Sequence, residues 1–366
     1  MNLCLIGEIN AVKAKGSNMK SVYHKLSIIL SAIFVCTTMV IMSPAMAKNP
    51  EVKWKIQSGY PHGDLSFELL KGFAEDVKKL SDGRFEIAVF ADPEIVPLEQ
   101  LFESTKMGVL DMLHAAGAFW GGIVPVGEIE FGIPYAYRIE SETDFVKKAD
   151  KIRQFFFEEG FADLLKKEYE KQGLIWLDMH TYGPVPFILS TKPIETMADL
   201  KGIKIRDEGL YTTWHNMLGA RGTYISGSEA YLALKTGVLD ACQWDVSAIS
   251  GLKLHEVAKY WIVGEENDHA IGHMLVNSTS YNKLPDDLKQ VLKTAAENYW
   301  HATVAGYQEE VEMAEQMVKD GIIMKNYLDD EAIAAHKKAA DAIWEEVARR
   351  DEASKKAIEM LKAWDR

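Results

Sequence analysis

The sequence is poor in cysteine, and its few cysteines are badly placed for pairing. The 366 residues contain three cysteines. Cys4 and Cys36 lie before or within an N-terminal apolar run, which leaves Cys242 as the one cysteine of the following chain. A single cysteine cannot close a disulfide within its own chain, so we expect the hydrophobic core alone to stabilise the fold.

Basic residues are outnumbered by acidic ones. The chain has 41 Lys and Arg residues against 54 Asp and Glu residues, which gives a formal net charge of −13 at pH 7. Nucleic-acid-binding proteins depend on positive surface charge to neutralise phosphates. The composition therefore argues against a nucleic-acid partner.

The best-known sequence signatures of hydrolases and nucleotide-binding proteins are missing. The sequence has neither a G-x-S-x-G motif nor a glycine-rich phosphate loop. His269 and His273 have the i, i+4 spacing of zinc-protease histidines, but the glutamate that acts as general base is absent. Their surroundings are strand-like, and on a strand the two side chains would be about 13 Å apart, too far for one metal ion.

The first 47 residues have the pattern of a secretory signal peptide. Lys20 and Lys25 precede an apolar run over residues 26–42, and small residues follow at Ala45 and Ala47. The run is shorter than the roughly 20 residues that a membrane-spanning helix needs. We therefore expect cleavage after Ala47 and a protein of the periplasm.

A repeated phrase indicates two similar halves. K-x-G-V-L-D occurs at residues 106–111 and again at 235–240, each time at the end of an amphipathic, helix-like segment. The glycine suits a left-handed helix cap, and Val-Leu should begin a buried strand. Ligands of open α/β sheets bind beyond the carboxyl ends of strands, which places residues 114–120 and 242–245 near a site. The repeat predicts two α/β lobes that face each other across a cleft.

Four ordered segments resemble the solute-binding proteins of tripartite ATP-independent periplasmic (TRAP) transporters. They are GVLDMLHAAG (108–117), MADLKGIKIRDEG (197–209), EAYLALKTGVLDACQW (229–244) and HEVAKYW (255–261). The resemblance covers essentially the whole chain after the signal peptide. It implies a binding protein without catalytic activity, which closes on a small organic acid anion and delivers it to the TRAP-type membrane permease subunits.

The expected fold is α/β with two lobes, like other periplasmic binding proteins. Each lobe should contain a mixed, mostly parallel sheet flanked by helices, and long helices should end the chain. We expect lobe I to comprise residues 48–172 plus about 259–300. Lobe II should comprise about 173–258 plus 301–366, with the C-terminal helices. The segment 329–366 is helical in pattern, either packed on one lobe or exchanged with a second copy in a homodimer.

Arg206 is the ligand-binding residue that the resemblance implies most directly. In the family, the arginine of the K-I-R motif binds the ligand carboxylate, and a planar guanidinium fork suits that task better than a lysine. Where the branch that binds 2-oxo and 2-hydroxy acids reads Glu-Trp, this chain has Gln243 and Trp244, followed by Asp245. These three residues are candidate ligands of a bridging calcium or sodium ion. If no cation binds, the site would use hydrogen bonds alone.

Other candidate ligand-binding residues follow strand ends on both sides of the expected cleft. Each has a structural alternative, because large aromatic residues fill cores and a lone histidine is often only hydrogen-bonded. They are Tyr60, His114, Trp120, His180, Tyr182, Asp268 and His269.

Two other functions compete with solute transport. A periplasmic enzyme acting on a small carboxylate could use His114, His180 and Asp245 in acid/base chemistry. A ligand-sensing partner of a membrane receptor would have the same sequence features as a transport protein. Detection of a reaction product would distinguish an enzyme from a transport protein. A neighbouring gene for a membrane permease would distinguish a transport protein from a sensing partner.

Overall fold

The computed structural model describes residues 50–264 and 267–365, so the predicted signal peptide lies outside the described residues. The strands are β1 (Val52–Ser58), β2 (Phe85–Phe90), β3 (Met112–Ala115), β4 (Leu174–Thr181), β5 (Phe187–Ser190), β6 (Lys204–Arg206), β7 (Arg221–Thr223), β8 (Ala241–Trp244), β9 (Tyr260–Val263), β10 (Ile271–Asn277) and β11 (Met324–Tyr327). The helices are α3 (Leu65–Leu80), α4 (Leu98–Lys106), α5 (Val126–Phe131), α6 (Phe145–Phe157), α7 (Phe161–Glu170), α8 (Met197–Leu200), α9 (Gly209–Met217), α10 (Gly227–Lys235), α11 (Ser278–Asn282), α12 (Asp286–Lys319), α13 (Asp330–Ala348) and α14 (Glu352–Ala363). Short 3₁₀ helices are η1 (Gly117–Trp120), η2 (Val246–Ala248) and η3 (Leu254–Glu256).

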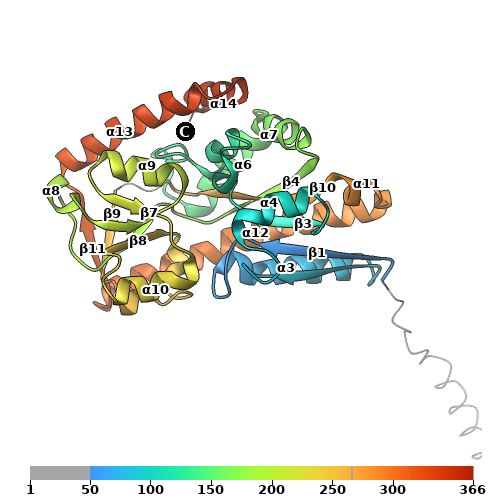
Figure 1. Cartoon of the computed structure of the whole chain (residues 1–366), viewed down its shortest axis with the longest axis horizontal. Coiled ribbons are helices and arrows are strands. Elements are labelled where there is room, and N and C mark those ends of the chain that lie inside the picture. The colour runs from blue at the N-terminus through green and yellow to red at the C-terminus, as the bar shows by residue number, and fades with distance from the viewer. Residues whose placement is uncertain (1–49, 265–266, 366) are drawn as a thin grey trace, which may run out of the picture. The chain divides into compact units, whose positions relative to one another are not determined.

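The first lobe is built on a five-stranded sheet with the order β2-β1-β3-β10-β4. Strand β1 is parallel to β2 and β3, whereas β10 is antiparallel to β3 and β4. Phe73 of α3 and Leu292 of α12 belong to one buried cluster with Trp54 and Ile56 of β1. These helices therefore cover one face of the sheet, as Figure 1 shows.

The second lobe is built on a six-stranded sheet with the order β11-β9-β5-β8-β6-β7. Strand β6 is parallel to β7 and β8, and β5 is antiparallel to β8 and β9. Helices α8, α9 and α10 accompany this sheet (Figure 1). The predicted fold class, with two mixed sheets flanked by helices, is confirmed.

The sheet order differs from the predicted lobe boundaries at two strands. We expected the residues of β4 in the second lobe and those of β9 in the first, but β4 pairs with β10 and β9 pairs with β5. The chain therefore crosses between the sheets at residues 182–186, again between β9 and β10, and a third time through α12, which leads from β10 to β11. Val185 of the first crossing and Asn267 of the second form an isolated bridge. Both strands are apolar and largely buried, so their composition alone did not indicate which sheet they join.

The two copies of the repeated phrase have the same backbone geometry. Gly108 and Gly237 follow α4 and α10 with φ of 78° and 74°. In the first copy, the Asp111 carboxylate accepts a hydrogen bond from the Lys55 amide at 2.9 Å, and the Asp111 amide donates to the Lys55 carbonyl at 3.1 Å. Asp240 makes the same two bonds with Lys204, at 3.0 and 2.8 Å. The aspartate thus holds each copy against the parallel strand beside it.

One detail of the phrase was predicted wrongly. Val109 and Val238 do not begin a buried strand, since they are 51% and 59% exposed. The leucines after them are buried, and the strands begin at Met112 and Ala241. The valines lie in the turn that the left-handed glycine creates.

The C-terminal helices contact both lobes. Helix α13 packs against α8 and α9 of the second lobe, whereas α14 packs against α5 and α7 of the first. Arg350, between the two helices, forms an ion pair with Glu128 of α5. The expected alternative of packing on one lobe alone is therefore wrong, because two helices that meet at residues 349–351 contact different lobes. Among the described residues, no helix is long and apolar enough to cross a membrane.

The left-handed glycine caps should contribute measurably to stability. An alanine at Gly237 would meet no atom within 4 Å, so its cost should come from the positive φ alone. We expect Gly237→Ala to lower the free energy of unfolding by about 1 kcal/mol, because a Cβ disfavours this conformation. Urea unfolding measures the change.

A matched control lies in the middle of α3. Gly72→Ala also meets no atom within 4 Å, and Gly72 has ordinary helical φ. The free energy of unfolding of the Gly72→Ala variant should rise by about 0.5–1 kcal/mol, since alanine is more favourable than glycine within a helix. Equal effects of the two substitutions would contradict the proposed role of the cap.

Candidate functional site

The carboxyl ends of strands from both sheets meet at one small internal cavity. Its volume is about 10 Å³, which is room for about one water molecule. Tyr60 follows β1, Tyr182 follows β4 and Glu208 follows β6. The side chains that line it are those of Tyr60, Phe131, Tyr182, Val185, Glu208, Gln243, Trp244 and Asp245. Both lobes and the crossing segment 182–186 therefore contribute to the cavity.

Arg206 lies beside this cavity and is 1% exposed, but its side chain does not line the cavity. Its guanidinium carbon lies 4.2 Å from the centre of a Trp244 ring. Nη2 donates to Glu208 Oε2 at 3.1 Å, Nη1 donates to the Gln243 carbonyl at 3.0 Å, and Nε donates to the Ile225 carbonyl at 3.1 Å. The charge of Arg206 is thus balanced by Glu208, and each guanidinium nitrogen has a partner.

Glu208 and Asp245 bring two buried carboxylates to the cavity wall. Burial is the main cause that raises the pKa of Glu208, and the charge of Arg206 opposes it. Burial also raises the pKa of Asp245, and the charge of Asp64 adds to the rise. Asp245 accepts from the Ser247 amide at 2.8 Å and from the Tyr307 hydroxyl at 3.3 Å. These hydrogen bonds hold the side chain, but none of them supplies a positive charge.

Gln243 and Trp244 bring the second lobe to the same cavity. Gln243 is 1% exposed, and its Oε1 has no hydrogen-bond partner among the described residues, while its Nε2 donates to the Trp244 carbonyl at 3.3 Å. Trp244 Nε1 donates to Asp64 Oδ2 at 3.2 Å, and Asp64 is the N-cap of α3 in the first lobe. The two lobes are therefore in contact at the site through this hydrogen bond.

His114 and His180 lie deeper in the first lobe and do not line the cavity. Their rings stack with centroids 4.2 Å apart. His114 bonds to Ser58 Oγ and to the Tyr299 hydroxyl, each at 2.9 Å, and burial lowers its pKa to about 3. His180 lies against Tyr182 with ring centroids 4.8 Å apart. Both imidazoles are therefore neutral near pH 7.

Trp120, Asp268 and His269 also lie away from the cavity lining, and their contacts account for their burial. Trp120 Nε1 donates to the Tyr169 hydroxyl at 3.2 Å. Asp268 forms an ion pair with Lys148 at 2.5 Å. His269 bonds to Thr181 Oγ1 and to the Phe145 carbonyl, each at 3.0 Å. Their part in ligand binding stays a prediction.

Three residues of the cavity wall were not predicted from the sequence. Glu208 follows the strand that ends at Arg206, so the same strand-end rule could have found it. Phe131 is the last residue of α5, and Val185 lies in the crossing segment. No local pattern marks these two, because only the tertiary fold brings them to the cavity.

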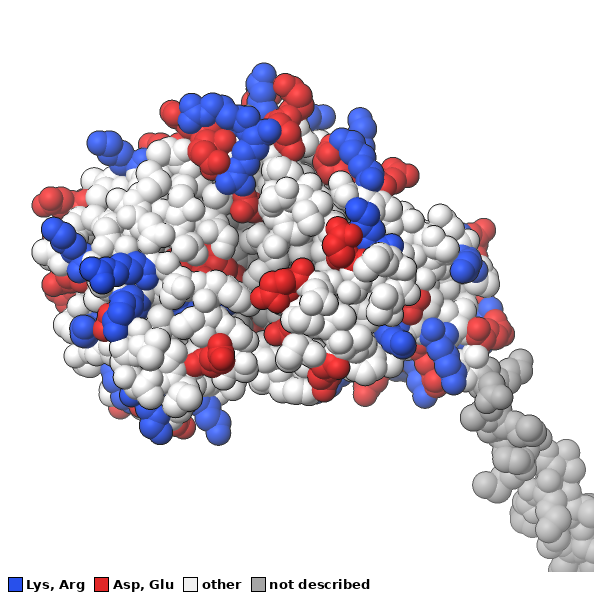
Figure 2. Space-filling model, viewed as in Figure 1, with Lys and Arg blue, Asp and Glu red and all other residues white. Residues whose placement is uncertain are grey.

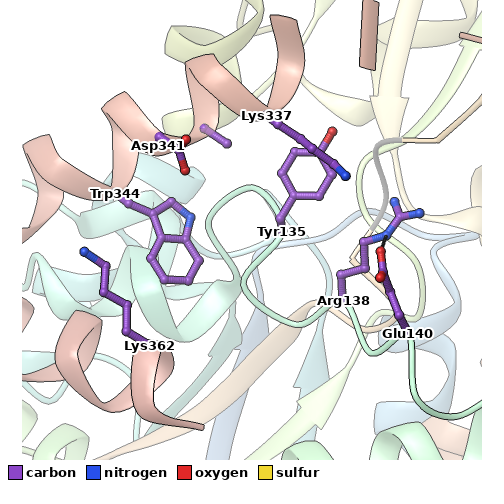
Figure 3. Close-up of a pocket in the computed structure, with 8 residues that line it drawn as sticks. Tyr135, Arg138, Glu140, Lys337, Asp341, Trp344 and Lys362 are labelled. Atoms are coloured by element: carbon purple, nitrogen blue, oxygen red, sulfur yellow. Dashed lines mark ion pairs between the residues drawn. The ribbon is translucent and has the colours of Figure 1, made fainter. Parts of the chain in front are cut away.

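A larger hollow of about 520 Å³ lies at the surface, between the loop 135–140 and the C-terminal helices (Figure 3). Lys337, Asp341 and Lys362 are among its lining side chains, together with Trp344, whose Nε1 donates to the Pro134 carbonyl at 2.8 Å. It contains no predicted site residue and lies beside no strand end. We therefore assign the candidate site to the internal cavity despite the difference in volume.

Acidic side chains are also visible around the hollow at the middle of the face in Figure 2. Among the described residues, no Lys or Arg side chain lines the internal cavity. Its wall consists of four aromatic residues, two carboxylates, an amide and a valine. The site that was expected to receive an anion is therefore lined by two carboxylates, and its neighbouring cation, Arg206, is paired with one of them.

Two α/β lobes joined by crossing segments, with a cavity between them, define the class of ligand-capturing binding proteins. The chain belongs to the bacterial extracellular solute-binding proteins, family 7, whose sequence model matches residues 57–351. This membership, together with the structural likenesses below, confirms the predicted resemblance to TRAP solute-binding proteins.

Relatives and solved structures share this organisation. A monocarboxylate 2-oxoacid-binding periplasmic protein of Nostoc sp. is 24% identical over 339 residues, 90% of this chain and 88% of the relative. A TRAP solute-binding protein of Bordetella bronchiseptica, a dimer solved with calcium and picolinate, has a TM-score of 0.75 at 22% identity and covers 86% of this chain and 92% of its own. A TRAP solute-binding protein of Chromohalobacter salexigens, solved with (S)-2-amino-1-propanol, has a TM-score of 0.78 at 19% identity. This match covers 86% of our chain and 96% of the solved chain.

The buried histidines should make stability depend on pH. Burial lowers the pKa of His269 to about 4 from an ordinary value of 6.5. Between these values the unfolded chain binds more protons at this residue than the folded chain does, so its effect is to reduce stability as pH falls. Relative to pH 8, the loss at pH 5 should be about 2 kcal/mol.

Substitution of His269 isolates this contribution. We expect the destabilisation caused by His269→Gln to be about 2 kcal/mol smaller at pH 5 than at pH 8. Urea unfolding at the two pH values measures it. The same substitution at His301, which is exposed on α12, is the control and should show no such difference. A pH-independent effect of His269→Gln would contradict the argument.

Proposed function

We propose that this chain is exported to the periplasm, captures a small organic acid anion by closure of its two lobes, and delivers it to a TRAP-type membrane permease. The observation that carries the proposal is the internal cavity where strand ends of both sheets meet, in a chain of the solute-binding family. Relatives bind monocarboxylate 2-oxoacids and picolinate, which supports a small acid as ligand.

Closure is the mechanism that fits the cavity. A volume of about 10 Å³ is far below the roughly 300 Å³ of typical ligand sites, so a ligand needs the lobes to part before it enters. The hydrogen bond from Trp244 to Asp64 joins the lobes and has to break when they separate. The crossing segment 182–186 and the described residues 267–270 before β10 are short connections in which hinge rotation can be absorbed.

Arg206 is the proposed partner of the ligand carboxylate. Its guanidinium carries five N–H donors, and three of them bond to Ile225, Gln243 and Glu208. The remaining donors on Nη1 and Nη2 are those that a carboxylate would accept in forked geometry. The three hydrogen bonds and the contact with Trp244 hold the guanidinium in place before the ligand arrives.

A cation that bridges to the ligand belongs to the proposal as an accessory. Gln243 Oε1 accepts no hydrogen bond among the described residues, and Asp245 Oδ2 accepts one, at 3.3 Å from Tyr307, so these two oxygens are the candidate ligands of a calcium or sodium ion. The Trp244 carbonyl, the third predicted ligand, accepts from Gln243 Nε2. Such an ion would supply positive charge between ligand and protein.

We propose a binding role without catalysis. The candidate acid/base residues His114 and His180 are neutral and lie outside the cavity lining, and Asp245 is held by Ser247 and Tyr307. A sensing role would use the same closure. The homodimer through the C-terminal helix stays a prediction, and α14 packs on its own chain here.

The arginine assignment is tested by Arg206→Lys. Lysine keeps the charge that balances Glu208 but loses the planar fork, whereas alanine would leave Glu208 buried without a counter-charge. We expect affinity for pyruvate and picolinate, measured by titration calorimetry on protein stripped of ligand by unfolding and refolding, to fall by about tenfold or more.

The matched control is Arg153→Lys. Arg153 forms a forked pair with Asp178 at 3.1 Å for each bond, away from the cavity. This variant should bind both acids as the parent does. Unchanged affinity in Arg206→Lys would remove the arginine from the ligand site, and conversion of either acid to a product would favour an enzyme.

A further inference from the structure

The wall of the internal cavity, in the residues that the structure describes, has no Lys or Arg side chain of its own to offset a ligand that carries negative charge alone. Glu208 and Asp245 line it, and Asp64 lies close enough for its charge to raise the pKa of Asp245. The one nearby cation, Arg206, already forms an ion pair with Glu208. In the described residues no further Lys or Arg side chain reaches the cavity lining, so the lining has no second cation to offset a ligand carboxylate.

The cavity also has features that point to a bound group of positive charge. Gln243 Oε1 is a buried acceptor that lines the cavity and has no donor among the described residues. Glu208 Oε2 accepts from Arg206, and no described residue donates to Oε1 of the same carboxylate. These oxygens are acceptors, so a ligand group facing them has to be a donor or a cation.

Aromatic rings complete the enclosure. Tyr60 lies with its ring centroid 5.2 Å from that of Tyr182 and 6.2 Å from that of Trp244. The ring centroids of Phe131 and Tyr182 are 6.2 Å apart. Rings of this kind attract ammonium groups through their negative faces, by roughly 2 kcal/mol where the group is desolvated. Carboxylates and aromatic rings together are the recognition chemistry of an organic ammonium group.

We infer that the ligand carries a positively charged nitrogen beside its carboxylate, and that Glu208, Asp245 and the aromatic wall receive this nitrogen. The inference rests on the proposed function, in which Arg206 takes the carboxylate. A zwitterion would place its negative end at Arg206 and its positive end at Glu208 and Asp245. A ligand of this kind leaves the charge of the site unchanged when it enters.

A metal ion is the competing source of positive charge, and the described side chains suit it less well. Calcium takes six to eight oxygen ligands. Among the described residues, no group of three His, Cys, Asp or Glu side chains is placed to hold a metal ion. The aromatic rings that form half of the cavity wall offer it no further oxygens apart from the tyrosine hydroxyls.

Pairs of molecules with the same shape test the inference. L-Alanine and isobutyrate, L-proline and cyclopentanecarboxylate, and glycine betaine and 3,3-dimethylbutyrate each differ by a charged nitrogen in place of carbon. We expect at least one zwitterion to bind the refolded mature protein about tenfold or more tightly than its carbon partner. Titration calorimetry in buffer with EDTA measures the affinities.

The variant Glu208→Gln gives a result of opposite sign under the two interpretations. If Glu208 receives the nitrogen, the zwitterion should bind about tenfold more weakly and its advantage over the carbon partner should shrink. If Glu208 only serves as the ion-pair partner of Arg206 in the absence of ligand, the amide should release the guanidinium and strengthen binding of the carbon acids.

Asp245→Asn is the second variant, and it should also reduce the zwitterion's advantage. Asp178→Asn, which removes a buried carboxylate outside the cavity, should not.

Other outcomes overturn the inference and separate it from the proposed function. Carbon acids that bind as tightly as their zwitterion partners would overturn the inference and leave the proposed capture of an organic acid intact. Pyruvate binding that appears only when calcium is added would show that the positive charge comes from a metal ion, with the same consequence. Binding of choline without any of the acids would support the ammonium site and refute capture of an acid. Failure of all these molecules to bind would refute both.

Discussion

The ion pair between Arg206 and Glu208 is the interaction on which the candidate site depends. Both side chains are buried, their nearest atoms are 3.1 Å apart, and the guanidinium carbon lies 4.2 Å from the centre of a Trp244 ring. A buried charge without a partner is strongly destabilising, so neither residue can be removed without a cost to the other. The pair therefore fixes the end of β6 and the direction in which a ligand carboxylate could approach.

The duplicated aspartate fixes the same helix-glycine-strand element in both lobes. Asp111 and Asp240 hold a helix-glycine-strand element against the neighbouring parallel strand by the same two hydrogen bonds. In each lobe the strand that follows leads into a 3₁₀ helix, η1 or η2. Both elements are built alike, but only the carboxyl end of β8 contributes lining residues to the cavity, through Gln243, Trp244 and Asp245.

Much of the fold could be predicted from the sequence because its signals are local. Helix caps at Gly108 and Gly237 and the alternating or apolar strand segments depend on neighbouring residues alone. The lobe boundary could not be predicted in the same way. Whether β4 joins β10 or β5 depends on contacts between segments far apart in the chain, and apolar strands look alike from either sheet.

The candidate site was predictable to the extent that its residues follow strand ends. Tyr60, Tyr182, Gln243, Trp244 and Asp245 do so, and the structure brings them to one cavity. His114 and His180 also lie at strand ends, but they point into the first lobe, where they stack on each other. The direction of a side chain depends on how its strand twists and pairs. It cannot be inferred from the residue type alone.

The attachment of the C-terminal helices to both lobes has a mechanical consequence. Helix α13 packs on α8 and α9 of the second lobe and also bonds to the first lobe through Trp344, whereas α14 packs on α5 and α7 of the first lobe, so parting of the lobes would pull on these contacts. The ion pair of Arg350 with Glu128 resists that pull at the joint itself. The C-terminal helices therefore connect the two lobes, and separation of the lobes would have to disrupt or shift the contacts that these helices make.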